Sequence, residues 1–218
     1  MKKIMYKMLI VSFVTLLLMP LEAKAQEIEF GVKGGLNLSL LTLDDANDNN
    51  LLPGFHAGVA LELPITTSFS LQPELMYSLQ GVKTSYDTDF LGIDVANGET
   101  DFKLHYINVP LYFKYNLAED FNIHVGPYIG FLTKAVVETD TEILDFVNVD
   151  DAEEIDKDRF NKVDAGATFG LGFELAPIVL GFDYNIGFMQ VAEEDDIAED
   201  LLGDAKNQVI QVYIGFIF

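Results

Sequence analysis

Residues 106–117 read YINVPLYFKYNL, and this stretch decides the fold because its side chains alternate between two kinds. One set of alternate positions is apolar or aromatic throughout: Ile107, Val109, Leu111, Phe113 and Tyr115. The positions between them include Asn108 and Lys114. A period of two is that of a β-strand, whose successive side chains point to opposite sides. The segment is therefore predicted to be a strand with one apolar face and one polar face.

The same alternation recurs along the chain and predicts eight strands. They lie at about 28–40, 53–63, 69–83, 102–116, 121–134, 162–175, 178–190 and 207–218. Glycine, aromatic and β-branched residues dominate them, as is typical of strands, and helical spacing is rare. Most of these runs are longer than an ordinary globular strand. They suit a tilted strand that crosses a bilayer, which needs about 9–11 residues.

The two faces of these strands differ sharply in composition. At five central alternate positions per strand, 37 of 40 residues on one face are apolar or aromatic and none is charged. Of the 32 positions on the other face, eleven are glycine and fourteen are polar or charged. A soluble barrel would have to fit the bulky apolar face inside, although eight strands leave barely enough room for side chains. An apolar outside and a polar inside follow the rule of outer-membrane barrels. The predicted fold is all-β, an eight-stranded antiparallel up-and-down transmembrane β-barrel.

The links between the strands alternate in length, which supports this topology. Short links lie at 64–68, 117–120 and 176–177, and long ones at about 41–52, 84–101, 135–161 and 191–206. The four long links carry charges of −3, −5, −8 and −6, which is nearly all of the acidity of the chain. Barrels of this class have short periplasmic turns and long outer loops. We therefore expect four acidic loops at the cell surface.

The N-terminus has the plan of a secretory signal peptide. Three lysines precede the apolar run at 8–19, and Ala23-Lys24-Ala25 forms an A-x-A cleavage site. A membrane-spanning helix would need about 20 apolar residues, so this run is too short to be an anchor. Residues 1–25 are predicted to be a cleaved signal peptide and 26–218 the barrel domain. Cleavage near Ala25/Gln26 would deliver the chain to the bacterial outer membrane and change its formal charge from −22 to −25.

Composition excludes several kinds of chemistry. The 218 residues contain no cysteine, which excludes disulfides and thiolate sites. Lys and Arg number 13 against 35 Asp and Glu, and this acidity argues against nucleic acid as a partner. No motif for a cofactor occurs, so none is expected.

Seven charged residues fall on the polar, inward face. They are Lys33, Glu62, Glu74, Lys114, Asp164, Glu174 and Asp183. An unpaired buried charge is costly, so in a narrow barrel these groups are expected to pair with one another as a structural plug. A conduction path is the alternative interpretation.

Two further interpretations concern histidines and acidic clusters. His56 and His105, with Asp101 nearby in sequence, suggest a histidine–carboxylate enzyme, but neither G-x-S-x-G nor H-E-x-x-H occurs, and no activity is expected. The acidic groups of the loops are carboxylates of the kind that bind Ca²⁺: Asp44, Asp45, Asp48, Asp150, Asp151, Glu153 and Glu154. The regular calcium-loop spacing is missing, which favours a solvated acidic surface and no specific metal site.

Aromatic residues near the predicted strand ends indicate interfacial belts. They are Phe30, Phe69, Tyr115 and Phe121 at the inner ends, and Tyr86, Phe90, Phe160 and Phe188 at the outer ends.

Several stretches together resemble a known family. They are EFGVKGGLNLS (29–39), LQPELMYSLQG (71–81), YINVPLYFKYNL (106–117), GPYIGFL (126–132), LGFDYNIGF (180–188) and VYIGFIF (212–218). In their order they resemble the porin-like outer-membrane β-barrel family of Bacteroidetes-type bacteria, which includes the PorT-like proteins. The resemblance implies the location and the fold, and for most of the family no defined activity. The aromatic C-terminus, Phe216 and Phe218, resembles the recognition signal for barrel assembly.

The resemblance and the face pattern together define the expected partners and functions. Outer-membrane lipid and the barrel-assembly machinery are expected partners, with other envelope proteins as further candidates. The leading hypothesis is a non-enzymatic barrel with a filled polar lumen that displays acidic loops. An accessory subunit of a secretion or envelope-assembly complex is the alternative, followed by a narrow passive channel.

Overall fold

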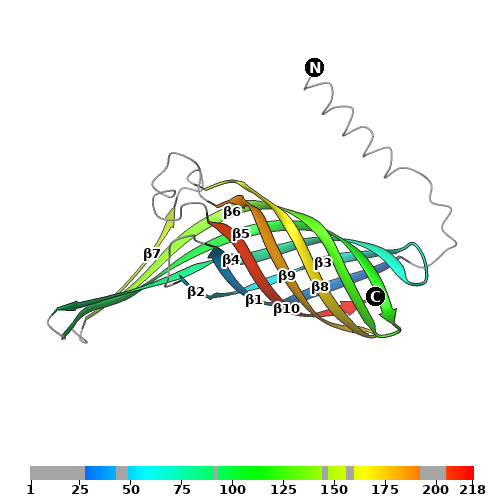
Figure 1. Cartoon of the computed structure of the whole chain (residues 1–218), viewed down its shortest axis with the longest axis horizontal. Coiled ribbons are helices and arrows are strands. Elements are labelled where there is room, and N and C mark those ends of the chain that lie inside the picture. Colours follow the sequence, from blue (N-terminus) through cyan, green and yellow to red (C-terminus); the bar gives the residue numbers. More distant parts are fainter. Residues whose placement is uncertain (1–27, 43–48, 91–92, 144–146, 156–159, 192–204) are drawn as a thin grey trace, which may run out of the picture.

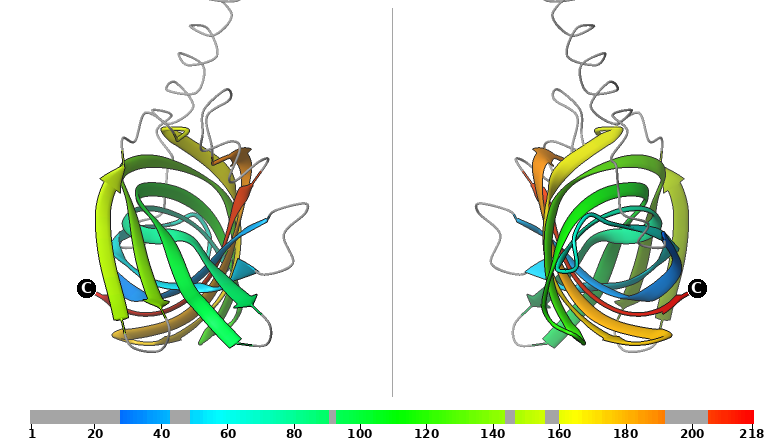
Figure 2. Two further views of the ribbon diagram at one scale, coloured as in Figure 1. Left: turned by 90° about the vertical axis from the view of Figure 1, so that its left-hand side faces the viewer. Right: turned by 90° about the vertical axis from the view of Figure 1, so that its right-hand side faces the viewer.

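The computed structural model describes residues 28–42, 49–90, 93–143, 147–155, 160–191 and 205–218. Within these ranges eight long antiparallel strands form one closed barrel (Figures 1 and 2). They are β1 (Glu29–Thr42), β3 (Leu52–Pro64), β4 (Phe69–Phe90), β5 (Ile93–Ala118), β6 (Phe121–Ile143), β8 (Val163–Leu175), β9 (Ile178–Gln190) and β10 (Lys206–Ile217). Two shorter strands, β2 (Asn49–Asn50) and β7 (Val147–Ile155), pair with β4 and β6. The predicted fold class is confirmed. In the described part of the chain, no helix has the length and apolarity needed to cross a membrane.

Long strands that follow one another in the sequence pair with one another, and the pairing of the first strand, β1, with the last, β10, closes the ring. β1 pairs with β10 from Gly31↔Ile217 to Thr42↔Lys206, and β4 pairs with β5 from Phe69↔Tyr115 onward. Closure gives each of the eight long strands two neighbours, which satisfies the backbone groups that lipid cannot.

The two ends of the barrel differ. Short links at residues 65–68, 119–120 and 176–177 lie at one end, which we call the turn end. The last residue is fixed there, because the backbone N–H of Phe218 donates to the carbonyl of Phe30 at 2.8 Å. The opposite end, called the loop end, carries the longer connections (Figure 1).

Three strands are longer than the alternation predicts. β4 and β5 remain paired up to Phe90↔Ile93, and β6 continues to Ile143 and pairs with β7. The expectation of loops over 84–101 and 135–161 is therefore wrong for most of their length. The period-two contrast of the sequence is weak over these extensions, although the backbone pairing continues.

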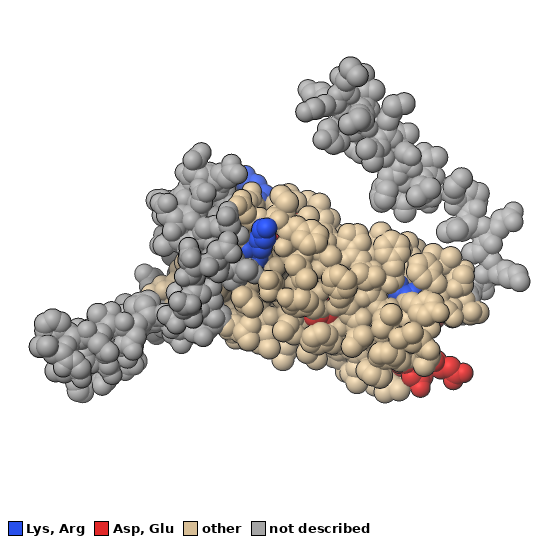
Figure 3. Space-filling model, viewed as in Figure 1, with Lys and Arg blue, Asp and Glu red and all other residues tan. Residues whose placement is uncertain are grey.

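The apolar face of the strands points outward and the polar face points into the lumen, as their composition predicts. Large apolar side chains are exposed on the outside of the wall, with Leu36 at 70% and Val212 at 57% of their accessible surface. Polar side chains are buried in the lumen, among them Asn37 and Asp183. Figure 3 shows an almost uncharged surface around the middle of the described barrel. The core of this protein is therefore its polar lumen.

Candidate functional site

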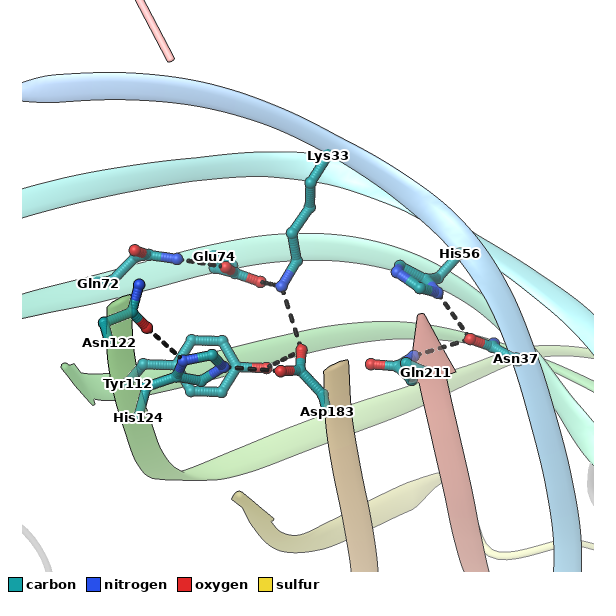
Figure 4. A network of polar contacts seen from close by, with 10 residues as sticks. All are labelled: Lys33, Asn37, His56, Gln72, Glu74, Tyr112, Asn122, His124, Asp183 and Gln211. Atoms are coloured by element: carbon teal, nitrogen blue, oxygen red, sulfur yellow. Dashed lines mark hydrogen bonds and ion pairs between the residues drawn. The ribbon is translucent and has the colours of Figure 1, made fainter. Parts of the chain in front are cut away.

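The lumen is crossed near its middle by Lys33, which projects from β1 (Figure 4). Its Nζ lies 2.9 Å from Glu74 Oε2 on β4 and 3.4 Å from Asp183 Oδ2 on β9. Nζ also lies 4.1 Å from the centre of the Tyr213 ring, at cation–π distance. The three charged side chains are buried. One ammonium group therefore links three parts of the barrel wall.

His124 completes this central layer. Its Nε2 lies 2.6 Å from Asp183 Oδ1 and its Nδ1 lies 3.0 Å from Asn122 Oδ1. Asn122 Nδ2 donates to Glu174 Oε1 at 2.8 Å, which orients the amide with its oxygen toward the histidine. Both ring nitrogens therefore face oxygen atoms, and the ring joins β6 to β9 through Asp183.

A second charged group lies toward the turn end. Lys114 on β5 pairs with Glu62 of β3 and Glu174 of β8. Ser70 Oγ donates to the same Glu62 at 2.6 Å. The lysine is buried and the two carboxylates are partly exposed, so this group forms the border between the closed lumen and solvent.

Asn37 organises an uncharged layer toward the loop end. Its Oδ1 accepts from His56 Nδ1 at 2.7 Å and from Gln211 Nε2 at 2.9 Å. Its Nδ2 donates to Ser78 Oγ at 2.9 Å and to the carbonyl of Leu79 at 2.8 Å. This single amide connects strands β1, β3, β4 and β10.

Asp164 differs from the other predicted lumen charges. Its Oδ2 accepts from Tyr128 OH and Asn207 Nδ2, each at 3.0 Å, and its Oδ1 has no hydrogen-bond partner. None of the described cationic side chains forms an ion pair with it. The structure thus brings six of the seven predicted charges into two ion-paired groups and leaves Asp164 with neutral partners only.

An apolar cluster closes the lumen at the loop end, and sequence reasoning missed it. The buried members are Val82, Leu104, Tyr106, Leu132, Ala135, Phe160, Val191 and Ala205. The sequence does contain a pattern that could have predicted this cluster, because Leu104 and Leu132 continue the inward alternation of their strands. The expected position of Phe160 in an outer aromatic belt is wrong, since this ring is only 2% exposed.

Glycines make room for the large lumen side chains. A Cβ at Gly181 would overlap the Tyr213 ring, and one at Gly166 would overlap the Tyr128 ring. The abundance of glycine on the inward face therefore follows from the width of an eight-stranded barrel.

The histidines suggested as a catalytic pair lie on opposite faces of the wall. His56 is buried in the lumen, whereas His105 Nδ1 lies 2.6 Å from the Tyr77 hydroxyl and belongs to the outward alternation of β5. The suggested calcium clusters fall outside the residues whose side chains the structure describes. Among those described, no group of three or more His, Asp or Glu side chains is placed to hold a metal ion.

The turn end of the lumen is open. A cleft of about 520 Å³, measured with its mouth, lies beside the start of β1 and the end of β10. Lys33, Lys114, His124 and Tyr213 line its inner part. Phe216 and Phe218 lie beside it on the wall and are exposed, and the Phe218 ring stacks on Phe30 with centroids 6.5 Å apart.

Comparisons with known proteins agree with this architecture. Residues 24–193 match the model of the outer membrane protein beta-barrel domain, a span that includes every strand except β10. The chain belongs to this family. It is an outer-membrane β-barrel protein, and its location is the bacterial outer membrane. No curated protein matches the sequence significantly.

Solved structures similar to the chain are also outer-membrane proteins, at low sequence identity. Ail of Yersinia pestis, crystallised with the heparin analogue sucrose octasulfate, is 14% identical, with 88% of this chain and 100% of Ail covered and a TM-score of 0.46. Neisserial surface protein A is 12% identical, with 88% and 99% covered and a TM-score of 0.46. The protease OmpT of Escherichia coli is 9% identical, with 91% and 100% covered and a TM-score of 0.35. These similarities concern the fold alone.

Proposed function

We propose that this protein is a non-enzymatic barrel with a filled lumen that anchors four acidic loops at the cell surface. The observation that carries the proposal is the network of buried ion pairs around Lys33, with an apolar cluster at the loop end of the lumen. A lumen filled in this way leaves the wall as an anchor and the loops as the parts able to meet ligands. The loop end is then extracellular, as in barrels whose long loops face outward.

The charges of the loops suggest what such a surface does. The segment 191–206 alone carries −6. A dense acidic surface concentrates cations and repels anions, and salt screens it within about 10 Å at 0.1 M. We therefore expect the loops to interact with cationic groups in a manner that weakens as salt increases.

The test compares the loops with a turn on the opposite end. The acidic residues of 191–206 are changed to Asn and Gln, and intact cells are exposed to fluorescent polylysine at low salt. The matched control neutralises Glu119 and Asp120 in the turn between β5 and β6. Less labelling of intact cells by the loop variant, with the control unchanged, supports the proposal. Equal labelling of the loop variant and the unaltered protein overturns it.

The accessory-subunit alternative is favoured by one observation, the cleft at the turn end. It contains both lysines of the lumen and opens on the side that would face the periplasm. A partner there would bind a wall or turn surface and not the loops. Light cross-linking in native outer membranes, followed by extraction in mild detergent, separates the two functions. A stoichiometric partner retained after loop deletion favours a subunit, and a solitary barrel favours display.

A further inference from the structure

The lysines outside the lumen are confined to one level of the barrel. Among the described residues they lie at the loop-end parts of the wall: Lys83, Lys103, Lys134, Lys162 and Lys206. At the turn end the link between β5 and β6 carries two carboxylates instead, Glu119 and Asp120. Figure 3 shows blue side chains near the loop end of the tan surface and a red group at the other end, with some blue also visible toward that end and some red near the middle. Within the described ranges, a chain of formal charge −22 thus places the cations of its wall at a single edge of the apolar belt.

Three of these lysines form a compact group on neighbouring strands, which we call the basic rim: Lys83, Lys103 and Lys134. The backbone register places Lys83 beside Asp101, and Lys134 beside His105, on β4, β5 and β6. Lys83 Nζ lies 3.5 Å from Asp101 Oδ1, and Lys103 also pairs with Glu138. Asp101 and Glu138 therefore hold Lys83 and Lys103 in position. Together with Lys134, these three lysines and two carboxylates sum to a formal charge of +1.

The basic rim borders the lipid-facing surface directly. On β6 the outward series Ile129 and Phe131, both about 40–45% exposed, is followed by Lys134. On β5 the outward Val109 and Ile107 lead to His105 and then Lys103. Lysines at such an edge extend their ammonium groups into the headgroup layer while their stems stay on apolar surface.

We propose that the basic rim binds the phosphate groups of glycolipid in the outer leaflet. The inference rests on the proposed orientation, in which the loop end is extracellular. Charge complementarity supports a phosphate ligand, because the acidic loops above the rim would otherwise repel an anionic headgroup. Ammonium groups bind phosphate as point charges, and a lysine near an anionic lipid surface attracts it measurably. The rim thereby offsets the repulsion between the loops and the leaflet that surrounds them.

The test is a titration of the full barrel in detergent micelles with fluorescent diphosphoryl lipid A. For K103Q/K134Q we expect Kd to rise about 30-fold, which equals about 2 kcal/mol for two lysines. K206Q, on the distant strand β10, is the matched control and should stay within about twofold. E138Q removes a carboxylate that competes for Lys103, so its Kd should fall. That gain of binding cannot arise from misfolding.

Three results would overturn the proposal. One is an unchanged Kd for K103Q/K134Q. Another is an equal rise in Kd for K206Q, which would indicate that binding depends on overall charge and not on a specific site. The third is equally tight binding of dephosphorylated lipid A by the unaltered protein. The polylysine experiment on intact cells reports on the loops alone, so its failure and the failure of lipid binding are distinguishable.

Discussion

Replacing Lys33 with methionine tests whether the lumen is stabilised by its ion pairs. Methionine preserves the length of the side chain and removes the charge. Lys33 neutralises Glu74 at 2.9 Å and Asp183 at 3.4 Å. After the change Asp183 keeps His124, but Glu74 keeps only the hydrogen bond from Gln72 Nε2 at 2.7 Å.

The expected loss can be worked out from these distances. At an effective dielectric constant of about 20, the two attractions amount to roughly 6 and 5 kcal/mol. Release of the desolvation cost of the ammonium group offsets part of them. Removal of one partner from a buried pair typically costs about 3–5 kcal/mol. Because two carboxylates lose their partner, we expect the free energy of unfolding to fall by at least about 3 kcal/mol.

The assay is urea unfolding of the barrel in lipid vesicles, followed by far-UV circular dichroism because the chain has no Trp. The double variant K33M/E74Q should recover about half of the loss or more, since it removes the stranded carboxylate. K206M, on the exposed loop-end edge, should change stability by less than about 0.5 kcal/mol. A K33M barrel within 1 kcal/mol of the unaltered protein would refute the ion-pair argument.

Three further predictions follow from the lumen. D164N should leave the free energy of unfolding unchanged or raise it, since that carboxylate has only neutral partners, whereas D183N should lose about 3 kcal/mol or more in the same assay. G35A would place a Cβ on the backbone of the adjacent strand β10 and should cost more than about 2 kcal/mol; in heat-modifiability gels G31A, whose nearest atom would be 3.3 Å away, should behave as the unaltered protein. In planar bilayers the folded protein should give no stable open channel, and reproducible single-channel steps would contradict a filled lumen.

The strands within the membrane were predictable because lipid and lumen impose opposite chemistry on alternate residues. The predicted ranges 53–63 and 178–190 agree with β3 and β9 to within a residue at each end. The prediction failed where this contrast ends, in the long hairpin of β4 and β5. Its pairing up to Phe90↔Ile93 depends on backbone hydrogen bonds that leave no alternation in the sequence.

The sequence predicts which charged residues face the lumen, but it does not predict which of them pair with one another. Alternation places Lys33 and Asp183 on the same face, yet the two are 150 residues apart in sequence and meet only because the barrel closes. The width of the barrel and its register decide that Lys33 reaches both Glu74 and Asp183 while Asp164 meets neutral groups. Neither quantity can be read from local spacing. The apolar cluster at the loop end was missed for a related reason, since Phe160 and Val191 join it from outside the regular strands.

The same residue type therefore has two physical roles in this barrel. The two lysines of the lumen are enclosed by carboxylates within about 3.4 Å, so their fields are cancelled locally and are shielded from salt by the wall. The lysines of the rim face the headgroup layer, where salt and lipid phosphate compete for them. The two lysines and five carboxylates of the lumen sum to −3, compared with −22 for the four long links, so the acidity of the chain acts mainly at the loop end. The stability of the barrel should thus depend on lumen geometry, and its interactions with the surroundings on the charges at the loop end.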